Sequence, residues 1–258
     1  MSRRARVEPV PGAPAAVART GDDRLLVVAD YHAGIEVGLR YERGVELESA
    51  ADDRLDRLER LLDRTEPDRL LVLGDLVHRI GRPDADEARE LRTLVDAVTD
   101  RVPMTLVPGN HDAGVADLVE EGDLELTVVD AAGVRFGRVG FLHGHTWPAA
   151  DVLRADVVCM GHEHPSVKLE DEVGGSRVER AWLRGRVDPA AFEGHVDGLP
   201  VDGSSPELVV VPAFNERSGG TWVNVDGQAF LAPFLPAALP DGELYLLDGT
   251  RLGPYRRL

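Results

Sequence analysis

Short apolar runs in this chain repeatedly end in aspartate, asparagine or histidine, which are residue types that can bind metal ions. The side chains in question are those of Asp30, His32, Asp75, Asn110, His143, His162 and His164. Two divalent cations about 3.5–4 Å apart, sharing one carboxylate, would need about this many ligands. Mixed nitrogen and oxygen donors suit Mn, Fe, Zn, Co or Ni better than Mg or Ca, which prefer oxygen alone. Mn is the expected metal, with Fe, Zn, Ni and Co as alternatives.

Hydrolysis of a phosphate ester is the chemistry that such a pair of metal ions performs. The metals would lower the pKa of a shared water, so that hydroxide exists at neutral pH, and would offset the charge of the phosphoryl group. The leaving alkoxide also needs a proton. His111 adjoins Asn110 but is not needed as a ligand, and Asp112 could orient its ring. His111 and Asp112 are therefore the predicted catalytic pair.

The elements that must position these residues are strands that stop just before them. Apolar runs predict strands at about 24–29, 69–73, 104–107, 138–142 and 156–160. Because the carboxyl ends of parallel strands meet at one edge of a sheet, we expect the polar residues to converge there. Helices are expected after residue 49, over 84–100 and near 112–120 and 148–154, with an irregular charged connection over 34–48.

The strand order indicates a mixed sheet, because consecutive strands are expected at about 124–129, 133–136 and 138–142. Further candidate strands lie at 166–170, 177–184, 207–212, 221–225, 228–231 and 243–247, and residues 188–206 are expected to form a surface loop. Residues 1–23 are interpreted as an N-terminal tail or edge segment, and residues 24–258 as a single domain.

The order of the motifs resembles that of the calcineurin-like metallophosphoesterase superfamily. The motifs are Asp30-x-His32, Gly74-Asp75, Gly109-Asn110-His111-Asp112, His143 and Gly161-His162-x-His164. The resemblance implies an α/β fold in which two mixed sheets and flanking helices form a four-layer sandwich. It also implies that Asp75 bridges two metals. The first would be bound by Asp30, His32, Asp75 and His164, and the second by Asp75, Asn110, His143 and His162.

Some further short motifs of the chain most resemble those of archaeal phosphoesterases related to the nuclease subunit of the double-strand-break repair complex. Bacterial relatives of these phosphoesterases accompany DNA ligases. The matching motifs are Gly74-Asp75-Leu76-Val77-His78, where His78 replaces a common aspartate, Asp30-Tyr31-His32-Ala33-Gly34-x-Glu36, and Pro212-Ala213-Phe214-Asn215. They imply a phosphodiesterase of the nuclease type, acting on DNA or RNA, with a repair helicase, ATPase or ligase as partner. The alternatives are a nucleotide or cyclic-nucleotide phosphodiesterase and a weakly active metal-bound scaffold. The roles of His78, His145 and Asn215 stay open.

The charge of the chain is strongly negative, with a formal net charge of −17 and Lys168 as the only lysine. This composition resembles that of halophilic archaea that accumulate salt, whose acidic surfaces stay hydrated in concentrated salt. The acidity can therefore reflect the solvent and does not exclude a nucleic-acid substrate. With no membrane-length apolar run and no signal-peptide pattern, the chain is expected to be cytoplasmic. Its single cysteine, Cys159, is expected to be buried and inert.

Overall fold

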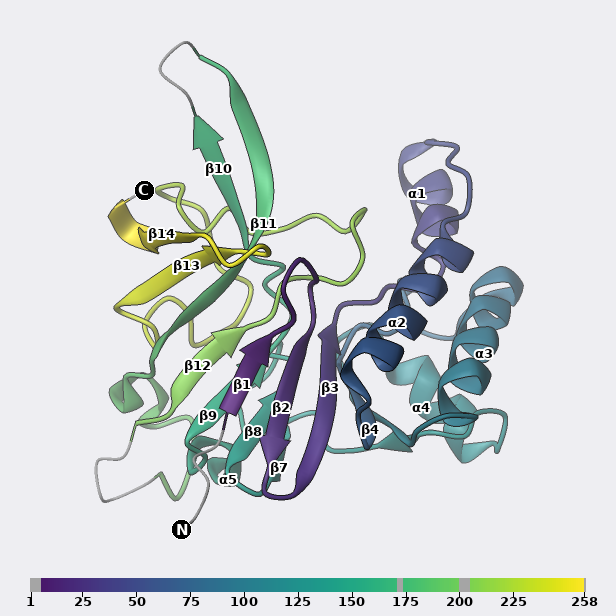
Figure 1. Ribbon diagram of the computed structural model, residues 1–258, viewed down its shortest axis with the longest axis horizontal. Coiled ribbons are helices and arrows are strands. Elements are labelled where there is room, and N and C mark those ends of the chain that lie inside the picture. The colour runs from purple at the N-terminus through teal and green to yellow at the C-terminus, as the bar shows by residue number, and fades with distance from the viewer. Residues whose placement is uncertain (1–5, 171–173, 200–204, 258) are drawn as a thin grey trace.

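The computed structural model describes residues 6–170, 174–199 and 205–257. Within these ranges the chain forms two sheets that pack face to face, with helices on the outer side of the first sheet (Figure 1). The mixed α/β sandwich expected from the sequence is therefore confirmed. No helix in the described ranges is both long and apolar enough to cross a membrane.

The first sheet has the strand order β1-β2-β3-β4-β5-β6. Its strands are β1 (Arg6–Pro9), β2 (Ala16–Thr20), β3 (Asp23–Ala29), β4 (Arg69–Leu73), β5 (Met104–Val107) and β6 (Thr127–Val128). The strands from β3 to β6 run parallel, whereas β1 and β2 add an antiparallel edge. The N-terminal segment that was expected as a tail or edge thus contains two edge strands.

The second sheet has the order β14-β13-β11-β12-β9-β8-β7, and β10 pairs with β11 alongside this path. Its strands are β7 (Val134–Phe136), β8 (Val139–Leu142), β9 (Val157–Met160), β10 (Ser166–Glu170), β11 (Ser176–Arg186), β12 (Glu207–Val210), β13 (Gly242–Leu246) and β14 (Arg251–Pro254). Only β8, β9 and β12 pair in parallel, so the sheet is mixed. The hairpin of β10 and β11 projects beyond the rest of the sheet (Figure 1).

The helices lie mainly on the first sheet. They are α1 (Ile35–Arg43), α2 (Ala51–Thr65), α3 (Ala85–Thr99), α4 (Ala113–Glu120) and α5 (Ala150–Leu153), with the short 3-10 helices η1 (Pro189–Phe192) and η2 (Tyr255–Arg257). Apolar side chains of α2, α3 and α4 pack on the outer face of β3, β4 and β5. The outer face of the second sheet is covered by α5, η1 and the segment between β12 and β13.

Strand β3 shows why the central strands are continuous apolar runs in the sequence. Leu26 and Val28 pack under the helices, whereas Leu25 and Val27 pack between the two sheets. A strand that is buried on both faces has no polar alternation. Cys159 in β9 lies in the same intersheet core, and burial raises the pKa of its thiol to about 12, which agrees with an inert side chain.

The structure differs from the sequence-based expectation in three segments. Residues 35–43 form α1 instead of an irregular connection; Gly38 interrupts the helical pattern in the sequence, and ion pairs of the buried Glu36 with Arg54 and Arg217 hold the helix. The strands expected at 221–225 and 228–231 do not form, apart from an isolated bridge between Ser166 and Trp222, because this segment bonds to a buried carboxylate instead. Strand β14 was not anticipated.

Candidate metal centre

The predicted ligand residues converge at the carboxyl ends of strands from both sheets. We define the first ligand group as Asp30, His32, Asp75 and His164, and the second as Asp75, His143 and His162. Within each group the potential ligand atoms all lie within 4.8 Å of one another, and Asp75 belongs to both groups. The shared carboxylate is the arrangement expected for a bridging ligand. The predicted assignment of metals to these residues remains a prediction.

Backbone conformation at this edge is unusual for residues other than glycine. Positive φ angles occur at Asp30 (56°), His32 (48°), Asp75 (49°), His162 (68°) and His164 (43°). Side chains with a Cβ disfavour this left-handed region, and residues held there cluster at functional sites. All five belong to the two ligand groups, so the turns that follow the strands are shaped to aim these side chains inward.

The first ligand group is centred on Asp30, which is fully buried. Its Oδ1 atom lies 3.2 Å from Nε2 of His164, and that nitrogen lies 3.5 Å from Nε2 of His32. His32 Nε2 is in turn 3.9 Å from Oδ2 of Asp75. Donor atoms that face one another at these distances fit a divalent cation placed between them.

The second ligand group brings His143 against Asp75 and Asn110. Nε2 of His143 lies 3.5 Å from Oδ1 of Asp75 and 3.3 Å from Oδ1 of Asn110. The rings of His143 and His162 have their centroids 4.7 Å apart. The side-chain oxygen of Asn110 thereby joins the second group, as the motif resemblance implies.

Two of the histidines are oriented by backbone carbonyl groups. His143 donates from Nδ1 to the carbonyl oxygen of Leu73 at 2.8 Å, and His164 donates from Nδ1 to that of Gly219 at 2.6 Å. This leaves Nε2 of His143 directed at Asp75 and Nε2 of His164 directed at Asp30. A metal-binding histidine is normally held through its other nitrogen in this way, so the donor set fits a metal site.

The electrostatics of the centre favour neutral imidazoles and an added positive charge. Burial lowers the pKa of His143 to about 3 and that of His162 to about 4. Burial, followed by repulsion from Asp30 and Asp112, raises the pKa of Asp75 well above its usual range. A second buried carboxylate is costly to ionise beside the first, and a bound divalent ion would remove that cost.

His164 shows where such a positive charge would be placed. Burial by itself would lower the pKa of His164, yet the Asp30 carboxylate raises it to about 9. The same contact lowers the pKa of Asp30, against the effect of burial. The proton shared by His164 and Asp30 lies where a metal cation would bind. His164 can bind a metal only as the neutral imidazole, so a bound metal ion would replace this proton.

The catalytic pair predicted from the sequence is only partly brought together. The His111 ring lies at the centre, with Nε2 3.8 Å from Oδ2 of Asp75, and its Nδ1 donates to the carbonyl oxygen of His78. Asp112 is fully buried and accepts hydrogen bonds from the backbone amides of Gly109 (2.8 Å) and Leu76 (2.9 Å). The prediction that Asp112 orients His111 is therefore wrong: Asp112 joins two ligand loops, and a backbone carbonyl orients the ring.

The remaining residues that the sequence left open take distinct places. His145 is half-buried and its ring centroid lies 5.3 Å from that of His143, outside both ligand groups. The His78 ring lies 5.4 Å from His32 and 5.9 Å from His111. Gly109 has no positive φ; a Cβ there would lie 2.2 Å from Oδ1 of Asp75, so glycine permits a close approach and not a tight turn.

One functional residue was missed by the sequence analysis. Glu163 lies between two predicted ligands and is fully buried. Its carboxylate accepts from the backbone amides of Leu231 (2.9 Å) and Ala232 (2.7 Å), and from the hydroxyl of Thr221 (3.1 Å). It thereby anchors the segment behind His164. A buried carboxylate with only long-range partners leaves no local signal in the sequence.

The chain is similar to known proteins in sequence pattern and in fold. The family model described as calcineurin-like phosphoesterase matches residues 23–188. The crystal structure of the nuclease MPE from Pseudomonas putida is 22% identical, with a TM-score of 0.54, and the match covers 96% of this chain and 100% of that chain. The phosphoesterase Yfce from E. coli is 18% identical, with a TM-score of 0.35, over 80% of this chain and 98% of that chain.

No curated protein is detectably similar to the chain. The likeness to the solved structures concerns the fold alone. The family model, however, spans more than half of the 258 residues and includes every member of both ligand groups. The chain therefore belongs to the calcineurin-like phosphoesterase family.

Proposed function

We propose that this protein is a dimetal phosphodiesterase that acts on nucleic acid. The observation that carries the proposal is the sharing of Asp75 between two ligand groups beside the ring of His111. Two divalent cations bound there, Mn²⁺ being the first choice, would activate a water and offset the phosphoryl charge. The family membership supports phosphoester hydrolysis, and the fold shared with a nuclease supports the nucleic-acid substrate.

His111 is the residue proposed to deliver a proton to the leaving oxygen. Its Nδ1–H is engaged by the carbonyl oxygen of His78, which fixes the plane of the ring. Its side chain is one-fifth exposed, so a substrate can reach part of the ring. In the imidazolium form, Nε2 carries the proton that a departing alkoxide requires.

A pocket beside the centre supports a substrate larger than a phosphate group. It measures about 440 Å³ and is lined by Gly34, Gly38, Tyr41, His78, Arg79, Asp84 and Glu87. Gly38 lets α1 approach His78, since a Cβ there would lie 2.2 Å from the imidazole ring. Tyr41 follows three residues later, on the same face of α1, and is 78% exposed. An exposed aromatic ring at this place can stack on a nucleobase.

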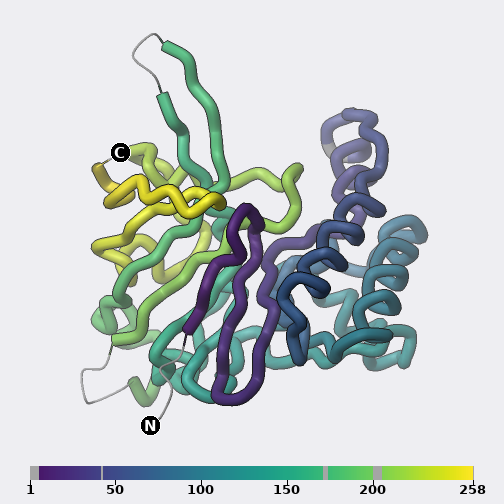
Figure 2. Tube along the Cα trace, in the orientation of Figure 1, coloured from purple at the N-terminus to yellow at the C-terminus, as the bar shows by residue number. Residues whose placement is uncertain are grey.

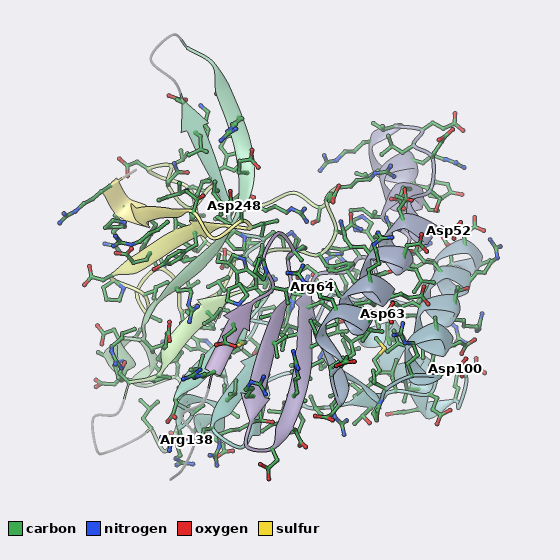
Figure 3. The ribbon with its side chains drawn as sticks, in the orientation of Figure 1. Asp52, Asp63, Arg64, Asp100, Arg138 and Asp248 are labelled. Carbon is green, nitrogen blue, oxygen red and sulfur yellow. The ribbon has the colours of Figure 1, made fainter. Side chains whose placement is uncertain are left out.

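The acidic surface supports the proposal that the protein works in concentrated salt. Figure 3 shows acidic side chains on the helical side of the molecule, with Asp52 and Asp63 on α2 and Asp100 directly after α3. Such a surface repels nucleic acid at low ionic strength, and this repulsion is screened as salt increases. The composition is the only support for a haloarchaeal origin. The motif resemblance alone supports a repair helicase, ATPase or ligase as partner.

The test is a matrix of metals and substrates measured in high salt. Mn²⁺, Ni²⁺, Co²⁺ and Zn²⁺ are each combined with a bis-aryl phosphate, single-stranded DNA and a cyclic nucleotide. The proposal expects turnover of the bis-aryl phosphate and of DNA, which Asp75→Asn abolishes. Turnover of the cyclic nucleotide alone would favour the nucleotide phosphodiesterase. Absence of turnover with every metal, together with a co-purifying partner, would favour the scaffold.

A further inference from the structure

The segment that follows β12 crosses from the second sheet to the first at the ligand edge (Figure 2). Val211 still donates to the carbonyl oxygen of Met160, at the end of β9, at 2.8 Å. Phe214 then donates to the carbonyl oxygen of Ala29, at the end of β3, at 2.8 Å. The segment therefore reaches the first ligand group at the point where Asp30 and His32 leave β3.

Asn215 binds three consecutive carbonyl groups at this point. Its backbone amide donates to the oxygen of Asp30 at 3.2 Å. Its side-chain Nδ2 donates to the oxygen of Tyr31 at 2.9 Å and to that of His32 at 3.3 Å. The side chain is buried, with 1% exposure, so water does not compete for these bonds.

The amide of Asn215 is itself held in one orientation. Its Oδ1 accepts from the backbone amide of Arg217 at 2.9 Å, so Nδ2 must face the carbonyl groups. The Arg217 guanidinium binds Oε1 of Glu36 at 2.7 Å, and Arg54 binds the same atom at 2.6 Å. A chain of polar contacts, part-buried at Arg217, thus links the ligand turn to α1 and α2.

The turn that Asn215 binds is one that would not hold its shape alone. Asp30 and His32 both have left-handed φ angles, which residues with a Cβ disfavour. His32 also lacks the carbonyl partner that orients the rings of His143 and His164: among the residues that the structure describes, its Nδ1 is buried and has no hydrogen-bond partner. No hydrogen bond at Nδ1 fixes the His32 ring, so the backbone conformation of the turn contributes to the direction of the ring.

We propose that Asn215 is a positioning residue for the first ligand group. It holds the Asp30-Tyr31-His32 turn in the conformation that points Asp30 and His32 at a shared metal ion. The inference rests on the proposed dimetal function. The second ligand group shares Asp75 with the first, but its other members come from turns that Asn215 does not bind.

The experiment measures Mn²⁺ binding by the full chain in high salt, by titration calorimetry and by electron paramagnetic resonance. Asn215→Asp keeps the shape of the side chain but places a carboxylate oxygen against two carbonyl oxygens. The matched control is Asn224→Asp. The Asn224 side chain likewise accepts from a backbone amide (3.0 Å) and donates to a backbone carbonyl (2.9 Å). Both groups belong to Lys168, which lies on the projecting hairpin.

The expected result for the unmodified protein and for Asn224→Asp is two bound Mn²⁺ ions with the signal of a coupled pair. Asn215→Asp is expected to keep one ion with its original affinity, to bind the other at least about tenfold more weakly, and to show an isolated Mn²⁺ signal. Should Asn215→Asp fail to fold, Asn215→Ala removes the same amide without adding charge and is judged by the same criteria.

Two outcomes overturn the inference. If the Asn215 variant binds two ions with unchanged affinity, the hydrogen bonds of Asn215 to the turn are not needed for metal binding. Equal weakening of both sites would show a general structural role. Both outcomes leave the proposed function intact. That function fails separately if the unmodified protein binds no Mn²⁺ and hydrolyses no phosphodiester.

Discussion

The imidazole of His143 and the backbone of Leu73 are joined by a hydrogen bond of 2.8 Å, from Nδ1 to the carbonyl oxygen. Leu73 is the last residue of β4, in the first sheet, whereas His143 follows β8, in the second. This contact is one of several that join the two sheets, and it aims the Nε2 atom of His143 at Asp75. The ligand edge is stable only where both sheets are in place.

Replacement of His143 should disable the second ligand group. Changing an outer partner of a metal ligand costs about 10–100-fold in activity, so loss of a ligand should cost at least about 100-fold. We expect His143→Ala to reduce Mn²⁺-dependent hydrolysis of a bis-aryl phosphate by that factor. The control is His195→Ala, since His195 is exposed and stacks on Trp147 outside both groups. Equal activity of the two variants would contradict the assignment.

The proton-donor role of His111 should depend on the leaving group. A general acid contributes about 100-fold or more when the leaving group is basic, and little when it is an activated phenolate. His111→Ala should therefore slow the cleavage of DNA, or of an alkyl aryl diester that loses its alkoxide, far more than that of a bis(nitrophenyl) ester. The measurement is kcat for each substrate at saturating Mn²⁺. An equal loss for all of them would argue for a different role.

Tyr41 should matter for substrates that carry a base. Stacking of one base on an aromatic ring contributes about 1–3 kcal/mol of binding. Tyr41→Ala is expected to raise KM for single-stranded DNA and to leave a bis-aryl phosphate unaffected, whereas Tyr41→Phe keeps the ring and should behave as the unmodified protein. If the phenylalanine and alanine variants lose DNA affinity equally, the hydroxyl and not the ring face is important.

The buried pair of Glu36 and Arg54 should make stability depend on pH. Burial alone would raise the pKa of Glu36, but the hydrogen bonds and charge of Arg54 lower it below 4.5. A carboxyl group with a depressed pKa stabilises the fold above its unfolded pKa, and this contribution is lost as pH falls through the folded value. The stabilisation should therefore be complete at pH 7 and decline below about pH 4.5.

Unfolding by urea at constant high salt can measure this contribution. Glu36→Gln should cost about 2 kcal/mol at pH 7, because Arg54 keeps its second partner, Glu90, at 2.7 Å. The difference from the unmodified protein should shrink as the pH falls below about 4.5, through the lowered pKa of the folded state. Glu121→Gln is a suitable control, since its pair with Arg82 is exposed and should not change the midpoint. A difference that is constant with pH would refute the ion-pair explanation.

The sequence by itself determined which strands end at the site and which side chains they present. Strand β3, for example, is an apolar run buried on both faces, and the polar residues directly after it must lie at its carboxyl end. The strands β4, β5, β8 and β9 follow the same logic, so the convergence of the predicted ligands could be anticipated from local pattern. The family resemblance added the division of these ligands between two metals.

Only the tertiary structure decided how those side chains are held. Asp112 was expected to orient the ring next to it, but it bonds amides of two loops, and the ring of His111 is fixed by a carbonyl from another segment. Asn215 and Glu163 act on turns far from them in sequence. Hydrogen bonds between distant segments depend on how the two sheets pack, and neither hydrophobic period nor residue spacing records that packing.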